Sequence, residues 1–558
     1  MPEGTPSRVQ RGTPRIPAPL GSPANPLGGA GSPWASAALG AAFFAIYLLL
    51  APAVPGDKDS GEFTLVLATN GVAHPTGYPL FTIFGHGFVR IAHALGASWA
   101  YAANAWSALG GGVALAFFHA LTVRLARLSG VRPPIAWAFA PALLFGLDPM
   151  WTVETTLAEV YSWHVAWALG ACLAFTGLVR LISMPDAALT GRGMLVRAAA
   201  WGALCGVGAA HHATFVFVAA PLSIGLLMAL ARAGRWRWRL MAAALVASLV
   251  PLASYSVIAW RAFHPAVVQW PVLAPTWKGV LRHITGAQYR MLLGHYGPSE
   301  VQRDYLERFV YPYVALALVA ALALAWRARA AMERLVMRTL LSAALLSTAY
   351  AFGYGAYDPS SYFLAGMAIG LSGLGPLGGD LLSGPRMGHV GRALGAPILA
   401  LALAAQIVPW MRMSAERREV YMRFESRVRQ MWASIPFTSG FVIWADDMFL
   451  RLREYQLLDG EKSGLSVVNP ALLTHPQPRK RFLEEHGFDP LAGIEDRITP
   501  LVLGWREFAP GPDSLVRDPG VLIARNINRQ TPLPVVEFLP ESASVRLLRK
   551  PAQASPSR

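Results

Sequence analysis

Long apolar stretches with few or no charges recur along most of this chain, and they restrict its fold more than any other feature. The first extends from Trp34 to Val54, close to the roughly 20 residues that an α-helix needs to cross a bilayer. Such stretches predict an α-helical polytopic membrane protein. Ten more follow, at about residues 101–123, 134–147, 155–179, 194–210, 213–231, 240–260, 309–326, 339–353, 361–379 and 394–410.

The composition agrees with a membrane protein and excludes disulfide scaffolds, fibrous proteins and disordered chains. Of 558 residues, 54% are hydrophobic and 14% charged, and the mean hydropathy is +0.39, whereas a soluble protein carries about 25% charged residues. The two cysteines, Cys172 and Cys205, lie inside apolar stretches and are too few for a disulfide framework or a metal cluster. The net charge of +16 lies mostly in short loops, where it indicates membrane orientation rather than nucleic-acid binding. We interpret Arg235-Trp-Arg-Trp-Arg239, for example, as an anchor to anionic lipid headgroups.

The segment 79–95 decides the predicted orientation, because it is apolar but contains His86, Arg90 and His93. If this segment lies flat as an interfacial helix, the chain has eleven spans and a cytoplasmic N-terminus. The inner segments then hold 19 Lys and Arg against 4 Asp and Glu, whereas the outer segments before residue 411 hold 8 against 10. The positive-inside rule predicts this imbalance, so we place the motifs described below on the outer face.

Two regions flank the predicted membrane domain of residues 34–410. Residues 1–33 are rich in Pro, Gly and Ser and predict a disordered, basic cytoplasmic leader. Residues 411–558 carry many charges and no span, and they predict a small soluble α/β domain on the outer, periplasmic side. Its strand-like runs are 441–444, 465–468 and 521–524.

The most informative motif is Asp57-Lys58-Asp59-Ser60-Gly61-Glu62-Phe63, which follows the first span and precedes His74-Pro75-Thr76-Gly77-Tyr78-Pro79. Three carboxylates beside a bilayer are costly unless they are solvated or functional. The simpler interpretation is a capping box, in which Asp59 is the N-cap and Glu62 the third residue of a short helix ending near Asn70. That interpretation leaves the second motif unexplained. Because residues three apart share one face of a helix, we take Asp59 and Glu62 as candidate catalytic residues.

These motifs resemble a membrane glycosyltransferase family that is related to the protein O-mannosyltransferases of the GT-C superfamily. The resemblance continues in order from about residue 57 to residue 363. Its further parts are Glu159-Val-Tyr161, Gly208-Ala-Ala-His211-His212, His283-Ile-Thr-Gly-Ala-Gln288-Tyr289, Tyr357-Asp358 and Tyr362-Phe363.

The resemblance implies a GT-C-like fold of about eleven transmembrane helices, whose first outer loop (55–100) carries interfacial helices and the catalytic acid/base. It implies a polyprenyl-phosphate sugar as donor and co-substrate, and no cofactor is expected. Asp59 stands where the family has its catalytic aspartate, the base that takes the proton of an acceptor hydroxyl, and Glu62 orients the acceptor or holds Asp59. The expected substrate-binding residues are His74, Tyr78, Glu159, Tyr161, His211, His212, Arg282, Gln288, Tyr289, Tyr357 and Asp358, with Arg261 as an alternative to Arg282 at the phosphate.

Several of these residues have simpler explanations, which the sequence leaves open. Glu159 can pair with a neighbouring helix, and Gln288-Tyr289 can pack a loop helix. His211-His212 can be a metal pair, but adjacent side chains on a helix diverge and no acidic partner is spaced nearby, so no metal site is expected. Asp446-Asp447 either binds a cation or caps the following helix.

The sequence therefore predicts a glycosyltransferase that moves a monosaccharide, with mannose as the expected sugar, to a hydroxyl acceptor such as Ser or Thr of an exported protein. A lipid or cell-surface glycan is an alternative acceptor. A transporter or flippase would need polar groups at mid-bilayer, often on broken helices in two related halves, but the charges concentrate at the ends of the spans and no internal repeat is visible. The high Ala, Gly and Arg content suggests a bacterial inner membrane.

Overall fold

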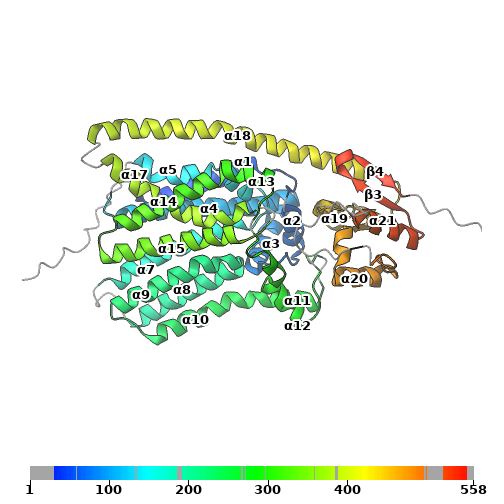
Figure 1. The fold of residues 1–558 in the computed structure, drawn as a ribbon, viewed down its shortest axis with the longest axis horizontal. Coiled ribbons are helices and arrows are strands. Elements are labelled where there is room, and N and C mark those ends of the chain that lie inside the picture. The colour runs from blue at the N-terminus through cyan, green and yellow to red at the C-terminus, as the bar shows by residue number, and fades with distance from the viewer. Residues whose placement is uncertain are drawn as a thin grey trace, which may run out of the picture.

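The computed structural model describes residues 31–548, except 58, 132–134, 185–190, 266–267, 271, 296, 357–358, 384–387, 496–497 and 499–518. Most of the predicted leader lies outside the described residues, as do Tyr357 and Asp358. The long helices run side by side to form a bundle, and a small sheet lies beyond one end of it (Figure 1). The predicted fold class, a helical polytopic membrane protein with a small C-terminal α/β region, is confirmed.

The bundle is built from the apolar stretches of the sequence. In the described part of the chain, eight helices are long and apolar enough to cross a membrane, or nine if one bent pair is a single span. The number of eleven spans stays a prediction. The bent pair is α13 (Glu300–Phe309) with α14 (Tyr311–Arg327). The other helices of the bundle are α1 (Pro33–Leu50), α4 (Trp99–Leu128), α5 (Ile135–Gly146), α7 (Tyr161–Ile182), α8 (Gly191–His211), α9 (Val216–Arg232), α10 (Trp238–Leu252), α15 (Ala331–Gly353), α16 (Leu364–Leu371), α17 (Leu374–Ser383) and the first part of α18 (Gly388–Ser434).

Glycines allow the closest helix pairs of the bundle to approach each other. A Cβ atom on Gly40 of α1 would lie 2.5 Å from the carbonyl oxygen of Gly112 on α4. On α8, Gly202 and Gly206 face α10, and their Cβ atoms would lie 1.8 and 2.3 Å from the carbonyl oxygens of Ala244 and Ser248. Pairs of small residues four apart are typical of contacts between membrane helices, where packing replaces the hydrophobic effect as the driving force.

Short helices gather at the end of the bundle that faces the sheet (Figure 1). The segment 79–95 forms α3, which is not among the candidate spans of the described residues and leaves Phe84 and Ile91 exposed beside its buried face. These features fit an interfacial helix, and the assignment of this end to the outer face stays a prediction. The short helices here are α2 (Ser60–Thr69), α3 (Pro79–Ala94), α6 (Pro149–Thr156), α11 (Ser256–Phe263) and α12 (Trp277–Ile284).

The C-terminal region is joined to the bundle by one continuous helix. Helix α18 has 47 residues and extends from the far end of the bundle to the sheet (Figure 1). The sheet has the order β2-β1-β3-β4, with β1 parallel to β2 and β3, and β3 antiparallel to β4. Its elements are β1 (Gly440–Ile443), β2 (Leu465–Val468), β3 (Val535–Leu539) and β4 (Ser544–Leu547), with α19 (Leu450–Leu457), α20 (Pro476–His486) and α21 (Pro519–Gln530).

One strand prediction is wrong. Residues 521–524 belong to α21, in which Ile523, Ala524 and Ile527 are buried against the sheet's apolar cluster. Their spacing is that of one helix face. A short apolar run looks the same in a buried strand and in a buried helix, so the sequence alone did not separate the two.

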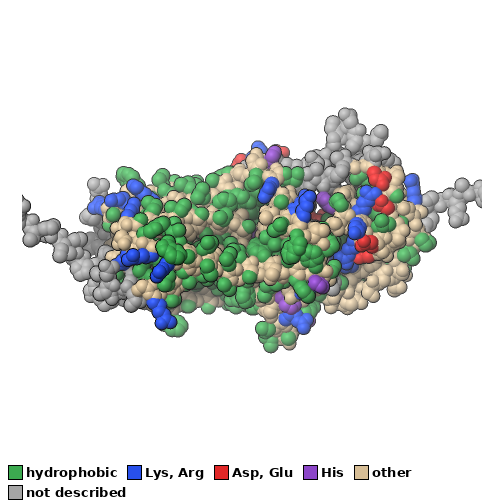
Figure 2. Space-filling model, turned by 90° about the horizontal axis from the view of Figure 1, so that it is seen from below, with side chains coloured by type: hydrophobic (Ala, Val, Ile, Leu, Met, Phe, Trp, Pro, Cys, Tyr) green, Lys and Arg blue, Asp and Glu red, His purple; other side chains and the backbone are tan. Residues whose placement is uncertain are grey.

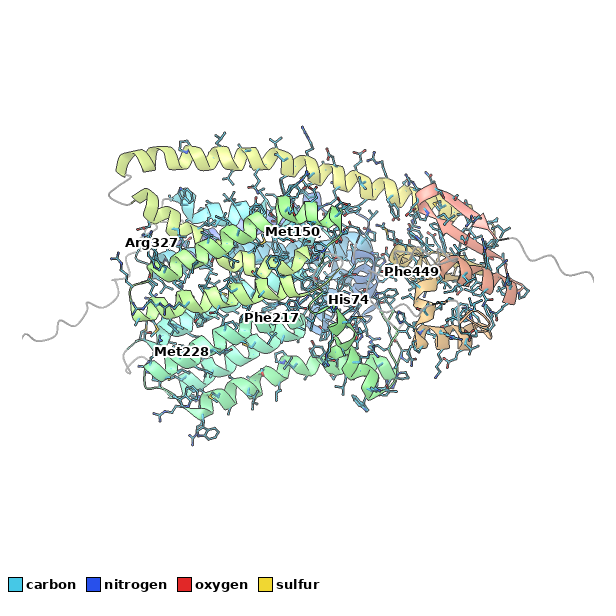
Figure 3. All side chains as sticks on the ribbon, in the orientation of Figure 1. His74, Met150, Phe217, Met228, Arg327 and Phe449 are labelled. Carbon is cyan, nitrogen blue, oxygen red and sulfur yellow. The ribbon has the colours of Figure 1, made fainter. Side chains whose placement is uncertain are left out.

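Charge is unevenly distributed between the two ends of the bundle. Figure 2 shows Lys and Arg side chains at the end away from the sheet, a broad apolar band beside them, and mixed charges around the C-terminal region. Figure 3 places Arg327 at the first of these ends and His74 at the other, toward Phe449 of the C-terminal region. An apolar band between two polar ends is the expected surface of a membrane-spanning bundle.

Candidate active site

Asp59 and Glu62 stand at the start of α2, but they do not form the capping box of the simpler interpretation. Asp59 is the N-cap residue, and its side chain makes no capping hydrogen bond. The side chain of Asp59 is 50% exposed and that of Glu62 only 2%. The two carboxylates therefore differ in environment, and neither is used to close the helix end.

Glu62 is held by His74 of the following loop. The backbone N–H of His74 donates to Glu62 Oε1 at 2.6 Å, and His74 Nδ1 lies 3.1 Å from both carboxylate oxygens. On the other side of the ring, His74 Nε2 lies 2.9 Å from the Tyr78 hydroxyl and 3.7 Å from Asp59 Oδ2. The two predicted motifs are thus brought together, and His74 lies between the two carboxylates.

The carboxylates keep this histidine charged. Burial opposes the imidazolium, but Glu62 and then Asp59 outweigh it and raise the pKa of His74 to about 9. Burial also raises the pKa of Glu62, while His74 lowers it. We take the pair as imidazolium and carboxylate at neutral pH, because Glu62 Oε1 already accepts the backbone N–H of His74 and is best satisfied as an anion. Both oxygens of Glu62 are thus occupied by His74, whereas the carboxylate of Asp59 is half-exposed to solvent.

A layer of rings continues from Tyr78 into the bundle. Tyr78 stacks on His212 with ring centroids 5.3 Å apart, and His212 lies 5.5 Å from Tyr161 and 4.6 Å from His164. Thr214 Oγ1 lies 2.6 Å from His212 Nδ1. The structure thus brings Tyr78, Tyr161 and His212 together, and their role in substrate binding stays a prediction. His164 and Thr214 join them but were missed because no motif singled them out.

His211 does not join this layer. Its ring packs edge-on against Phe81 of α3, with centroids 5.6 Å apart. Glu159 is fixed through its backbone, which donates to Ser107 Oγ at 2.9 Å and accepts from that hydroxyl at 2.8 Å. The backbone contacts hold Glu159 in place, whereas both ring nitrogens of His211 are buried and make no hydrogen bond within the described residues. The substrate-binding roles of His211 and Glu159 stay predictions.

The long segment between α10 and α13 covers the site. His283 Nε2 lies 3.0 Å from the carbonyl oxygen of Ala73, directly before His74. Burial raises the pKa of Tyr289, as do the neighbouring carboxylates of Asp59 and Glu62. Arg282 is exposed on α12. Burial lowers the pKa of His475 in the C-terminal region, and the charge of Arg282 lowers it further. Tyr289 is thus close enough to Asp59 and Glu62 to feel their charge, and Arg282 is close enough to His475 to act on it. The substrate-binding roles of Tyr289 and Arg282 stay predictions.

Gln288 and Arg261 are not tied to the carboxylates. Gln288 Oε1 is buried and accepts no hydrogen bond within the residues that the structure describes. The backbone carbonyl of Arg261 accepts a hydrogen bond from Gln269 at 2.6 Å, which closes the turn after α11. The orphaned oxygen of Gln288 is a free acceptor for a ligand hydroxyl, while Arg261 acts through its backbone in the described contacts.

The C-terminal region forms another wall of the site. Asp446 caps the turn Asp447–Phe449 by accepting the Met448 N–H at 2.8 Å, as one of the two predictions for this pair states. Burial, then Asp446 and the carboxylates of Asp59 and Glu62, raise the pKa of Asp447 to about 7. Asp447 was missed as a site residue, because only the fold brings β1 to α2.

The same groups offer ligands for a cation. One ligand atom each from Asp59, Glu62 and His74 lie within 4.8 Å of one another. Binding would require His74 to lose the proton that its pKa of about 9 holds at neutral pH, which costs roughly 3 kcal/mol. The geometry therefore fits the ion pair better than a metal, and the absence of a metal stays a prediction.

Known proteins resemble this chain in the region of the site. Residues 59–236 match the family described as "Protein O-mannosyl-transferase TMEM260 N-terminal domain". The resemblance found in the motifs is confirmed. A relative from Dictyostelium discoideum, "Protein O-mannosyl-transferase tmem260", is 25% identical over 288 residues, which make up 48% of this chain and 33% of the relative. The chain thus spans about a third of the length of that relative.

Solved structures of one archaeal enzyme are also similar to this chain. One is the oligosaccharyltransferase AglB from Archaeoglobus fulgidus in complex with an inhibitory peptide and a dolichol-phosphate, with a TM-score of 0.46 and 14% identity over 75% of this chain and 63% of the other. Another is that oligosaccharyltransferase tethered to an acceptor peptide, with a TM-score of 0.45 and 13% identity over the same shares.

Proposed function

We propose that this chain is a glycosyltransferase that moves a monosaccharide, mannose in the simplest case, from a polyprenyl-phosphate donor to a hydroxyl acceptor, with Asp59 as the base. The names of the family and of the relative support the reaction class. One observation carries the choice of base: Asp59 is the half-exposed carboxylate of the site, while Glu62 is buried on His74. A base must reach the proton of an incoming acceptor, and Asp59 is placed to do so.

The proposed reaction is a single displacement. The acceptor oxygen forms a bond to the anomeric carbon while the bond from that carbon to the donor phosphate oxygen breaks, and the acceptor proton passes to Asp59. The negative charge leaves on the polyprenyl phosphate, where the cationic ring of His74 stabilises it. Glu62 is then a positioning residue that keeps His74 charged. A single displacement inverts the configuration at the anomeric carbon.

The test is donor consumption by the purified full-length protein, with a panel of polyprenyl-phosphate sugars and cell-envelope acceptors. Asp59→Asn should lower turnover by about 10²-fold or more, the usual contribution of a general base. Glu419→Gln is the matched control, because Glu419 is exposed on α18 and pairs with Arg423 one turn away. Full activity of Asp59→Asn would refute the assignment, and turnover of no donor would refute the reaction class.

We further propose that the acceptor binds between the first loop and the C-terminal region, on what would be the periplasmic face of a bacterial inner membrane. Two observations support this placement: the charge of Asp59 helps to raise the pKa of Asp447, and a Cβ atom on Gly61 of α2 would lie 3.8 Å from the Leu450 side chain, three residues after Asp447. Asp447→Asn should raise the KM for the acceptor and leave the KM for the donor unchanged, whereas Glu484→Gln, at an exposed position of α20, should change neither. A protein, a lipid and a glycan acceptor are compared in the same assay, and an unchanged acceptor KM would contradict the placement.

A further inference from the structure

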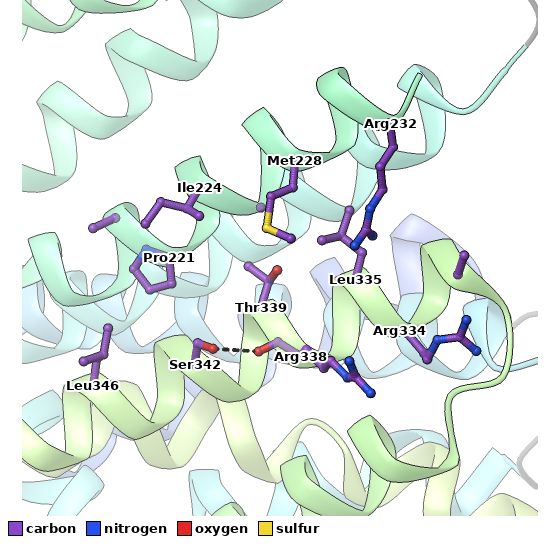
Figure 4. A pocket seen from close by; sticks show the side chains of 13 residues that line it. Pro221, Ile224, Met228, Arg232, Arg334, Leu335, Arg338, Thr339, Ser342 and Leu346 are labelled. Carbon is purple, nitrogen blue, oxygen red and sulfur yellow. Dashed lines mark hydrogen bonds between the residues drawn. The ribbon is translucent and has the colours of Figure 1, made fainter. Parts of the chain in front are cut away.

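A groove lies between two helices of the bundle at the end opposite to the candidate active site. It has a volume of about 460 Å³ and is lined by the antiparallel helices α9 and α15 (Figure 4). Three arginines line one part of it, Arg232 from the last turn of α9 and Arg334 and Arg338 from the first turns of α15. The remaining lining is mainly apolar and includes Ile224 and Leu346. The groove therefore has a cationic end and an apolar end.

The three arginines of the groove have few partners in the part of the chain that the structure describes. Within the residues that the structure describes, none of them lies within ion-pair distance of a carboxylate. Arg334 donates to the carbonyl oxygen of Arg329, and the nearby Glu333 accepts the backbone N–H of Arg329 at 3.0 Å to cap α15. The arginines consequently retain most of their hydrogen-bond donors, and guanidinium groups bind phosphate oxygens with paired N–H donors.

The apolar end of the groove lies inside candidate spans. Ile224 is 57% exposed and Leu346 46% exposed, and both belong to helices long and apolar enough to cross a membrane. From Arg334 to Leu346 the chain advances twelve helical residues, or about 18 Å. That length exceeds half of the hydrocarbon core, which is roughly 30 Å thick. An acyl chain can thus follow the groove while its headgroup stays at the arginines.

We propose that this groove binds one anionic glycerophospholipid, with its phosphate among Arg232, Arg334 and Arg338 and an acyl chain between α9 and α15. A soluble phosphate would use the cationic end and leave the apolar end uncovered. Arginines from two helices line the same end of one groove, so the groove defines a site, whereas the other basic residues of this end attract the headgroup region as a whole. The proposal does not depend on the glycosyltransferase assignment.

The test is native mass spectrometry of the full-length protein in detergent, titrated with phosphatidylglycerol. The double variant Arg232→Gln/Arg338→Gln should bind the first phosphatidylglycerol at least tenfold more weakly. Arg237→Gln/Arg239→Gln removes the same charge from the start of α10, where both side chains are exposed, and should bind like the wild type. Ile224→Trp fills the apolar end without changing charge and should also weaken binding.

Four results would overturn the proposal. Equal losses in the two double variants would show only general attraction to basic residues. Phosphatidylcholine binding as tightly as phosphatidylglycerol would exclude recognition of the anionic headgroup. Glycerol 3-phosphate binding as tightly would make the apolar end irrelevant, and tighter binding of a polyprenyl phosphate would identify a different occupant.

Discussion

Arg451 connects the C-terminal region to the loop that carries the candidate base, and replacing it gives the most direct test of that connection. Its side chain is 1% exposed. The guanidinium donates to Glu425 Oε2 at 2.6 Å, to the carbonyl oxygen of Gly56 at 2.9 Å and to that of Pro55. Gly56 in turn donates its N–H to Ser60 Oγ at 3.1 Å, next to Asp59. Arg451 thus holds the loop from which α2 starts.

The expected cost of Arg451→Met follows from these contacts. The Met side chain keeps much of the buried volume but removes the charge. Among the described residues, Glu425 then keeps the Tyr455 hydroxyl at 2.6 Å and Arg429 at 3.5 Å. Breaking a buried ion pair by removing one partner costs about 3–5 kcal/mol. Because the two loop carbonyls also lose their donor, we expect most of this cost to appear as local opening of residues 55–66.

Hydrogen exchange of the full-length protein measures this opening. A loss of 3–5 kcal/mol corresponds to exchange about 10²- to 10⁴-fold faster in residues 55–66, since each 1.36 kcal/mol is a factor of ten. Arg453→Met is the matched control, because Arg453 lies on the same helix and donates to Gln456 at 2.9 Å within it. Unchanged exchange of residues 55–66 in Arg451→Met, in a protein that remains folded, would refute the reasoning.

Two further predictions concern the ion pair and the helix packing. The raised pKa of His74 implies a stabilisation that is complete below about pH 6.5 and lost as the pH rises to about 9; at most about 3 kcal/mol is involved. Glu62→Gln should therefore flatten the fall of Tm between pH 6.5 and 9, and a slope equal to that of the wild type would contradict the pairing. Gly202→Ala should lower Tm strongly, because its Cβ would lie 1.8 Å from the carbonyl oxygen of Ala244, whereas Gly177→Ala, with no atom within 4 Å of its Cβ, should not. Equal Tm values for the two glycine variants would contradict the close α8–α10 contact.

The sequence predicts those parts of the fold that depend on local pattern. The length of an apolar stretch is sufficient to identify a membrane helix, and α1 (Pro33–Leu50) and α7 (Tyr161–Ile182) were found in this way. The arginine distribution predicted that 79–95 does not span, and α3 is not among the candidate spans of the described residues. Local pattern does not identify the secondary structure of a short, fully buried segment. Residues Val521–Ala524 are an example, because a buried helix face and a buried strand have the same short apolar run.

The candidate site was predictable only where its residues are close in the sequence. Asp59, Glu62, His74 and Tyr78 lie within 20 residues, and the structure brings all four together. Asp447 was not predicted as a site residue, because it follows Asp59 by almost 400 residues in the sequence. Only tertiary packing brings it close enough to α2 for the charge of Asp59 to raise its pKa. Arg282 was predicted as one of two candidate arginines for the donor phosphate, and in the structure it is exposed on α12, where its charge acts on His475. Its role at the phosphate stays a prediction.

The roles of Asp59 and Glu62 show what the sequence leaves undetermined. Residues three apart share a helix face, so spacing makes the two carboxylates equivalent. The difference arises from His74, whose backbone N–H and ring both bind Glu62 and hold it in the interior, while Asp59 lies 3.7 Å from the other side of the same ring. His74 therefore holds Glu62 in the interior and leaves Asp59 half-exposed, and the proposed role of Asp59 as the base depends on this contrast. We therefore expect Glu62→Gln mainly to change how turnover depends on pH, whereas Asp59→Asn should lower turnover by about 10²-fold or more at every pH.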